Sequence, residues 1–219
     1  MAKKVGVVLS GCGVYDGAEI HESVITMLAL DRRGAEMVFC APDVAQMHVV
    51  NHLTGEVDEA DERNVLVESA RIARGAIRDV AEVSADELDA LILPGGFGAA
   101  KNLCDFAVAG SDCTVNPDVA ALVRQVHDQG KPVAAVCIAP ALIAKVLGGE
   151  TPELTIGTDA GTAGALEAMG ARHVACPVDE FVIDRERKLV SSPAYMLGKS
   201  ISEVAAGIDK TVDALLELA

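Results

Sequence analysis

The sequence predicts an α/β fold in which helices cover a mostly parallel sheet. Short apolar segments of strand length alternate with longer helix-forming segments, and this alternation is typical of parallel strands joined by crossover helices. The composition agrees, because 51% of the 219 residues are hydrophobic while only 3% are aromatic. A core of alanine, valine, isoleucine and leucine is typical of strands that are buried on both faces. No repeat or flexible linker interrupts the chain, so we expect a single domain over residues 1–219.

In the first half of the chain, short apolar runs predict strands and longer mixed runs predict helices. Strands are expected at Val5–Leu9, Glu36–Cys40, Ala76–Val80 and Leu88–Leu93. Helices are expected at Ala18–Arg33 and Asn64–Ala73, with one capped helical turn at Ser84–Glu87. Residues 42–61 show no clear periodicity beyond a short strand and turn near Val49–Gly55.

In the second half, the same patterns continue to the end of the chain. Helices are expected at Asp118–Gln129, Ile138–Leu147, Thr162–Met169 and Ile201–Leu218. Strands are expected at Val133–Val136 and Leu154–Ile156, and a two-stranded ribbon at Phe181–Arg185 with Leu189–Ser192. Between the two halves, Lys101–Asn116 is expected to be a surface connection that packs its two thiols, Cys104 and Cys113.

A single cysteine, Cys137, lies where the predicted strand 133–136 changes into the predicted helix 138–147. Pro140 fits the first turn of this helix, where its missing N–H would have no partner. A nucleophile at such a junction lies on a sharp turn at the carboxyl edge of the sheet. The helix N-terminus is expected to lower the pKa of the thiol and favour the thiolate. The pattern also fits a small buried cysteine that packs between strand and helix.

Two glycine-rich segments follow predicted strands and are candidates for loops that contact a ligand. Pro94–Gly98 reads Pro-Gly-Gly-Phe-Gly, and such a loop can donate backbone N–H groups to an oxyanion, although it also fits a plain turn. Ser10–Gly17 contains Gly-Cys-Gly, which is weak evidence for phosphate binding because the third glycine of a dinucleotide fingerprint is misplaced. Asp16 and Glu19 form the expected N-cap pair of the helix that follows.

Two carboxylates, Glu19 and Glu22, lie with His21 in the first turns of this predicted helix. One of them could turn back toward the carboxyl edge of the sheet, where Cys137 is expected. The alternative is that both simply favour the positive end of the helix dipole. The sequence leaves these two interpretations open.

The cysteine and histidine spacings argue against a bound metal. Six cysteines are scattered along the chain, and none forms C-x-x-C or lies at ligand spacing from a histidine. His48 and His52 are four residues apart, but the valines between them and the nearby glycine favour surface histidines over a helical metal pair. A chain of this length needs no disulfide bonds, so we expect reduced thiols, and we expect neither a metal nor an organic cofactor.

The charge of the chain excludes several partners. A formal net charge of −15 argues against nucleic acids and anionic membranes, because both attract basic surfaces. No apolar run approaches the length of a membrane span. The first residues pass into a predicted strand without the apolar segment of a signal peptide, so we expect a cytoplasmic location.

Three segments together resemble the ThiJ/PfpI superfamily, the single-domain relatives of class I glutamine amidotransferases. They are Gly17–Val24, Leu93–Gly96 and Ala134–Pro140, and Ser191–Tyr195 is similar to the ending of the family. Within the superfamily, the chain resembles the enhancing-lycopene-biosynthesis branch, a bacterial glyoxalase-like branch with mitochondrial relatives. The runs typical of this branch are Ser10–Gly17, Asn51–Gly55 and Gly95–Leu103. The resemblance covers nearly the whole chain and implies a flavodoxin-like, three-layer α/β/α sandwich.

The resemblance also implies roles for individual residues. Cys137 corresponds to the nucleophile of the family, and Glu22 corresponds to the carboxyl group that contacts its thiol. The backbone N–H groups of Gly96 and Ile138 correspond to an oxyanion hole. Three further residues are candidates for lining the site, namely Cys12, Asp16 and Glu19.

One departure from the family pattern bears on the chemistry. Ile138 stands where the protease-like and glutaminase-like branches carry a histidine, and no His-x-Glu follows later in the chain. Without a neighbouring imidazole, no group is at hand to give a proton to a leaving amine. The departure therefore argues against hydrolysis of peptides or glutamine, unless His173 is brought near by the fold.

These observations lead us to expect a cofactor-independent glyoxalase that needs no glutathione. Cys137 would add to the aldehyde of glyoxal or methylglyoxal, Glu22 would act as acid and base, and glycolate or lactate would be released. Two alternatives stay open: a deglycase that repairs early glycation adducts on proteins or nucleotides, and a non-enzymatic redox sensor or binding protein in which Cys12 would resolve an oxidised Cys137. The expected partners are a small reactive dicarbonyl and, by resemblance, a second copy of the chain in a homodimer.

Overall fold

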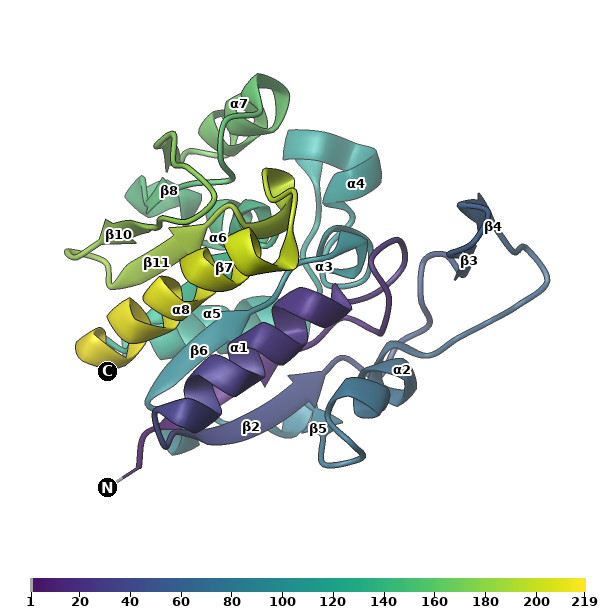
Figure 1. Cartoon of the computed structure of the whole chain (residues 1–219), viewed down its shortest axis with the longest axis horizontal. Helices are drawn as coiled ribbons and strands as arrows, with labels where there is room; N and C mark the ends of the chain where they lie inside the picture. The colour runs from purple at the N-terminus through teal and green to yellow at the C-terminus, as the bar shows by residue number, and fades with distance from the viewer. Residues whose placement is uncertain (1) are drawn as a thin grey trace.

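The computed structural model describes residues 2–219, and its centre is a seven-stranded sheet between two layers of helices (Figure 1). The strand order is β10-β11-β7-β6-β1-β2-β5. The strands are β1 Lys4–Val8, β2 Glu36–Ala41, β5 Arg78–Asp79, β6 Ala90–Leu93, β7 Val133–Val136, β10 Val182–Asp184 and β11 Leu189–Ser192. Every pairing in this sheet is parallel except that of β10 with β11. The predicted α/β class and three-layer arrangement are confirmed.

The helices are distributed over both faces of the sheet. They are α1 Ile20–Arg32, α2 Val65–Ile72, α3 Phe97–Lys101, α4 Phe106–Ala109, α5 Pro117–Asp128, α6 Pro140–Leu147, α7 Ala160–Ala168 and α8 Ile201–Leu218. α1 and α8 lie side by side on one face, and α5 and α6 pack together on the other (Figure 1). Two small sheets lie outside the central one, β3 Val50–Asn51 with β4 Glu56–Val57, and β8 Glu153–Leu154 with β9 Arg172–His173. Within residues 2–219, no helix combines the length and apolarity that a membrane crossing requires.

The core has one half on each face of the sheet, as the period-two alternation of β1 shows. Val5 and Val7 face the cluster that contains residues of α1 and α8. Val8, one residue further on, faces the cluster that contains residues of α5 and α6. All three side chains are buried. Because β1, β6 and β7 are neighbours and parallel, their carboxyl ends meet at one edge of the sheet, and the candidate site lies there.

The start of α1 differs from the expected cap. The helix begins at Ile20, two residues later than predicted, because Glu19 keeps an extended backbone and its side chain accepts the N–H of Glu22 at 2.6 Å. Asp16 takes no part in this cap. It is buried, and its Oδ2 accepts the N–H of Val50 at 2.7 Å. A local capping pattern could not reveal a partner 34 residues away along the chain.

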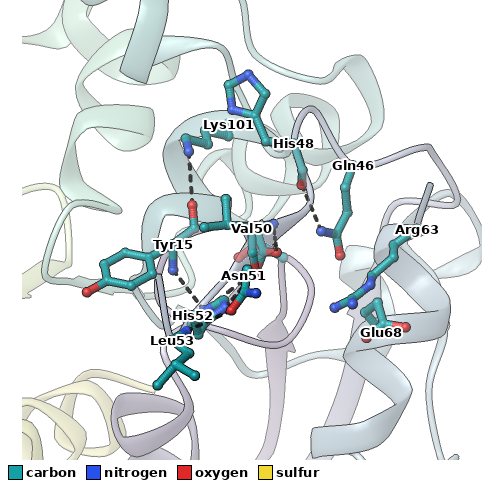
Figure 2. A network of polar contacts seen from close by, with 12 residues as sticks. Tyr15, Gln46, His48, Val50, Asn51, His52, Leu53, Arg63, Glu68 and Lys101 are labelled. Carbon is teal, nitrogen blue, oxygen red and sulfur yellow. Dashed lines mark hydrogen bonds and ion pairs between the residues drawn. The ribbon is translucent and has the colours of Figure 1, made fainter. Parts of the chain in front are cut away.

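Residues 42–63 form an arm that carries β3 and β4 away from the body of the protein (Figure 1). The β3–β4 hairpin of the arm contacts the glycine-rich loop 10–17 and holds it in place (Figure 2). The N–H of Tyr15 donates to Nε2 of His52 at 3.2 Å, and Lys101 donates from Nζ to the carbonyl of Tyr15 at 2.9 Å. The loop is thus fixed between the arm and α3.

Two other predicted elements are shorter or more structured than expected. The strand predicted at 76–80 contains only β5, because a 3₁₀ turn takes over at Val80–Glu82. The connection 101–116 includes the short helix α4, while Cys104 and Cys113 are buried as predicted. The ribbon of β10 and β11 and the last helix α8 lie where the sequence predicts them.

Candidate active site

Cys137 lies on the sharp turn between β7 and α6, at the carboxyl edge of the sheet. Its φ of 60° is in the left-handed region, which a side-chain-bearing residue adopts only when the surrounding structure holds it there. One such restraint is visible, because the Cys137 N–H donates to the carbonyl of Ser192 at 2.9 Å. Only 7% of the residue is exposed. The structure therefore has the strand–turn–helix elbow that the sequence predicts.

Glu22 approaches the elbow from the first turn of α1 and is completely buried. Two backbone N–H groups hold its carboxylate. Gly95 donates to Oε2 at 3.0 Å, and Tyr195 donates to Oε1 at 3.0 Å. The side chain also lies close enough to the thiol of Cys137 for each group to shift the pKa of the other. Segments that are far apart in the sequence thus position the carboxyl group against the sulfur.

Gly95 makes this approach possible. A Cβ at this position would lie 2.3 Å from Cβ of Cys137 and 2.6 Å from Oε2 of Glu22. Real Cβ atoms do not approach other heavy atoms so closely, so only glycine leaves room for the contact between carboxyl group and thiol. This is the physical reason for a glycine at the first position after Pro94.

The environment of the thiol contains opposing influences on its pKa. Burial raises the pKa of Cys137 well above its usual range, and the negative charge of Glu22 raises it further. The nearby backbone N–H groups of Gly96 and Ile138 act in the opposite direction and lower the pKa of the thiol. The expectation of a lowered thiol pKa is therefore wrong, because desolvation outweighs the helix N-terminus.

Burial also raises the pKa of Glu22, to about 7. The N–H groups of Tyr195 and Gly95 and the thiol of Cys137 lower it, while the charge of Glu19 raises it. Near neutral pH the carboxyl group and the thiol therefore hold either one proton or two between them. In the state with one proton, the thiol is the donor and the carboxylate the acceptor, so Glu22 is placed to take the proton when sulfur attacks.

A cavity of about 320 Å³ opens above the thiol. Most of its wall is apolar, and it comes from several separate parts of the chain. The lining residues are Val14, Glu19, Gly96, Phe97, Ala100, Phe106, Ala107, Cys137, Ile138, Thr162, Tyr195 and Met196. Glu22 is not among them. Glu19 is the one lining residue that has a carboxyl group, and its Oε2 accepts the N–H of Glu22 at 2.6 Å.

The structure brings only some of the predicted site residues together. Glu19, Gly96 and Ile138 surround the cavity with Cys137, but Cys12 and Asp16 do not line it. Cys12 lies near Glu68 of α2, whose charge adds to burial in raising the pKa of the Cys12 thiol. This placement gives no support to Cys12 as a partner that resolves an oxidised Cys137.

His173 does not take the place of the missing histidine. It lies in β9, where its Nε2 accepts the N–H of Ile156 at 3.4 Å, and it does not line the cavity. Within residues 2–219, no three His, Cys, Asp or Glu side chains form a group that could hold a metal ion.

Sequence reasoning missed four contributors to the cavity, Phe106, Ala107, Thr162 and Met196. Phe106 and Ala107 belong to α4 and Thr162 to α7, while Met196 lies in the turn before α8. None of them follows a strand of the central sheet directly, so no local pattern marked them. The family ending Ser191–Tyr195 was the one available signal, because it predicts that the segment just before Met196 approaches the site.

Comparison with known proteins places this geometry in a family. The DJ-1/PfpI family model matches residues 11–193. The human glutamine amidotransferase-like class 1 domain-containing protein 3, mitochondrial, is 49% identical over 99% of this chain and 84% of its own length. The mitochondrial ES1 protein homolog of rat is 48% identical over 98% of this chain and 84% of its own length.

Two solved structures agree over the whole chain. The isoprenoid biosynthesis protein with amidotransferase-like domain from Ehrlichia chaffeensis has a TM-score of 0.93 at 37% identity, covering 99% of each chain. A ThiJ/PfpI domain protein from Brachyspira murdochii has a TM-score of 0.62 at 15% identity, covering 100% of this chain and 99% of its own. This second, more distant likeness shows the shared fold alone.

The names of the relatives correct one expectation. The proteins of human, rat and zebrafish that match this chain are all named mitochondrial. The expected cytoplasmic location is therefore wrong by this comparison. That expectation relied on the absence of an apolar leader. Such a leader is a feature of secretory signal peptides, so its absence does not bear on mitochondrial proteins.

Proposed function

The chain belongs to the DJ-1/PfpI family, and from this premise we propose that it is a cofactor-independent glyoxalase acting on α-oxoaldehydes. One observation supports this proposal above the others. A buried thiol lies beside a buried carboxyl group of raised pKa and two backbone N–H groups, and it opens on a cavity. This arrangement suits addition of sulfur to a carbonyl carbon followed by proton transfers.

The lining of the cavity favours a dicarbonyl over an amide substrate. Ile138 follows the nucleophile, and the described residues that line the cavity include no histidine. Hydrolysis of an amide requires a proton donor for the leaving amine. An α-oxoaldehyde has no leaving amine, because both of its carbonyl carbons stay in the product.

In the first step, Sγ of Cys137 adds to the aldehyde carbon and its proton passes to the carboxylate of Glu22. The new S–C bond takes its electron pair from sulfur, and the C=O π electrons become an oxyanion. The N–H groups of Gly96 and Ile138, which are near the sulfur in the free protein, become available to this oxygen. Protonation of the oxygen by solvent gives the hemithioacetal, and Glu22 keeps the proton of the thiol until the C–S bond breaks in the last step.

In the second step, a proton moves from the carbon bonded to sulfur to the neighbouring carbon. A base takes the C–H proton, the electron pair forms the C=C bond of an enediolate, and the second carbonyl oxygen takes the negative charge. Protonation of the second carbon, with transfer of the hydroxyl proton from the first carbon to this oxygen, gives a thioester of the 2-hydroxy acid. Glu22 was expected to carry this proton as well, but it is completely buried and does not line the cavity. We assign this transfer to Glu19, the one residue with a carboxyl group that lines the cavity.

In the last step, water attacks the thioester carbon, the C–S bond breaks, and the thiol regains its proton. The released product is glycolate from glyoxal or lactate from methylglyoxal. The sum of the steps adds one water to the substrate and changes no net oxidation state, so no external oxidant or reductant is required.

The test is to follow glyoxal by NMR without glutathione. Cys137→Ala is expected to abolish glycolate formation, and Glu19→Gln and Glu22→Gln to lower kcat by about 10²–10⁴-fold. The matched control is Cys176→Ala, which removes a buried cysteine outside the cavity and is expected to keep the rate. Turnover by Cys137→Ala at the wild-type rate would refute the proposal. Faster loss of a purified glycation adduct than of free glyoxal would instead favour the deglycase.

A further inference from the structure

We infer that the preferred substrates are α-oxoaldehydes with an uncharged apolar substituent larger than methyl, an aryl group above all. This inference rests on the proposed function and concerns the same cavity. It depends on three properties of the cavity wall: its volume, its apolar lining and its charge.

The cavity is larger than glyoxal requires. Its volume of about 320 Å³ lies in the range of roughly 300–1,000 Å³ that is typical of sites for drug-sized ligands. Glyoxal has only four non-hydrogen atoms and would leave most of this space to water. A substituent on the second carbonyl carbon would extend from the thiol into the unused part of the cavity.

The lining beyond the thiol is suited to an apolar group. Phe97 and Phe106 contribute aromatic rings from α3 and α4, and Val14 and Met196 contribute aliphatic surface. Phe97 is 48% exposed, which is unusual for a residue that could bury its ring. A ring of the substrate would cover apolar surface that is otherwise in contact with water, and aromatic pairs gain a further contribution from their geometry.

The charge of the wall disfavours anionic substituents. Among the described residues that line the cavity, none is Lys, Arg or His, and the one charged side chain is that of Glu19. Lys101 is close by on α3, with its Nζ 5.3 Å from the centroid of the Phe97 ring, but this Nζ donates to the carbonyl of Tyr15 at 2.9 Å and the residue is not part of the wall. A carboxylate or phosphate on the substrate would thus have no counter-charge in the wall of the cavity itself.

The experiment compares kcat/KM for glyoxal, methylglyoxal, phenylglyoxal and 4-carboxyphenylglyoxal, with Cys137→Ala as the background for each. The kcat/KM for phenylglyoxal is expected to exceed that for glyoxal by at least about tenfold, since a single methylene in an apolar pocket can contribute that much. The aldehyde of the carboxylated analogue is next to the same aryl ketone as in phenylglyoxal. Its kcat/KM is expected to be at least about tenfold lower than that of phenylglyoxal.

A pair of variants on α4 locates the preference in the cavity. Ala107→Trp adds bulk to the wall and is expected to lower kcat/KM for phenylglyoxal about tenfold more than for glyoxal. Val108→Trp adds bulk at the next position, which is 66% exposed and outside the wall, and is expected to change neither value.

The outcomes separate this inference from the proposed function. Turnover of glyoxal that equals or exceeds that of phenylglyoxal overturns the inference and leaves the glyoxalase standing. Equal rates for phenylglyoxal and its carboxylated analogue overturn the part that concerns charge. Failure of wild type to convert any of the four substrates overturns both.

Discussion

Replacing Gly95 with alanine tests whether contact between Glu22 and Cys137 is required. Gly95 does not have a left-handed backbone, so alanine meets no conformational penalty of its own there. The obstacle is space, because the new methyl carbon would lie 2.3 Å from Cβ of Cys137 and 2.6 Å from Oε2 of Glu22. Gly95→Ala thus inserts an atom between the acid and the thiol without removing either group.

The magnitude follows from these distances. Ordinary contacts between carbon atoms are at about 3.5–4.0 Å, so Cβ of Cys137 and the new methyl must separate by roughly 1 Å or more. Overpacking of a buried site costs about 1–3 kcal/mol in the free energy of unfolding. A displacement of about 1 Å between reacting groups can cost ~10²-fold in rate, so kcat/KM for glyoxal is expected to fall by at least this factor.

The assay measures glycolate formation by NMR and the free energy of unfolding by urea titration for Gly95→Ala and a matched control. The control is Gly149→Ala, where the added methyl meets no heavy atom within 4 Å. It is expected to keep the wild-type rate and to change stability by no more than about 0.5 kcal/mol. A folded Gly95→Ala protein with wild-type kcat/KM would refute the requirement for the contact between carboxyl group and thiol.

Three further predictions concern the buried carboxylates. Because burial raises the pKa of Glu22 from 4.5 to about 7, the folded protein holds a proton that the unfolded chain loses, so the contribution of Glu22 to stability is greatest below the lower value and falls as the pH rises through this window. The loss in the free energy of unfolding is on the order of 3 kcal/mol, at ~1.4 kcal/mol per pH unit. Urea titrations at several pH values should show that this free energy depends less on pH in Glu22→Gln than in wild type. Glu22→Gln also removes a charge that raises the pKa of Cys137, so iodoacetamide should alkylate Cys137 faster in this variant at pH 8. An unchanged alkylation rate, measured by peptide mass spectrometry, would show that the charge of Glu22 does not raise the pKa of the thiol. Asp16→Ala leaves the N–H of Val50 without its acceptor, which should cost about 1–3 kcal/mol and speed proteolysis within residues 42–63; equal cleavage rates would show that Asp16 does not fix the arm.

The sequence was sufficient wherever a local pattern determines the structure. The strand–turn–helix signal at Cys137 predicts the elbow, because an apolar run, a break and a helical run are all local features. The last helix, Ile201–Leu218, is predicted to the residue because Ser200 caps it through the N–H of Glu203. The loop at Gly95 and Gly96 was a candidate oxyanion loop for the same local reason.

The parts that could not be predicted depend on contacts between distant segments. Asp16 looked like a capping residue, yet its partner Val50 comes from the arm. The pKa of Cys137 was expected to fall, because the helix N-terminus is visible in the sequence while the depth of burial is not. Glu19 lines the cavity, whereas Glu22 is completely buried and does not. Which of the two lines it depends on the side of the start of α1 on which the cavity opens, and this is not a local feature of the sequence.

The most direct test of the central claim is to look for the covalent intermediate on Cys137. Wild-type protein is mixed with an excess of glyoxal, quenched in acid within the first turnover, and measured as intact protein and as peptides. The proposed mechanism predicts added mass equal to one glyoxal on the peptide that contains Cys137, together with glycolate in solution, and neither for Cys137→Ala. Glycolate formed at the wild-type rate by Cys137→Ala, with no adduct at residue 137 in wild type, would contradict this mechanism.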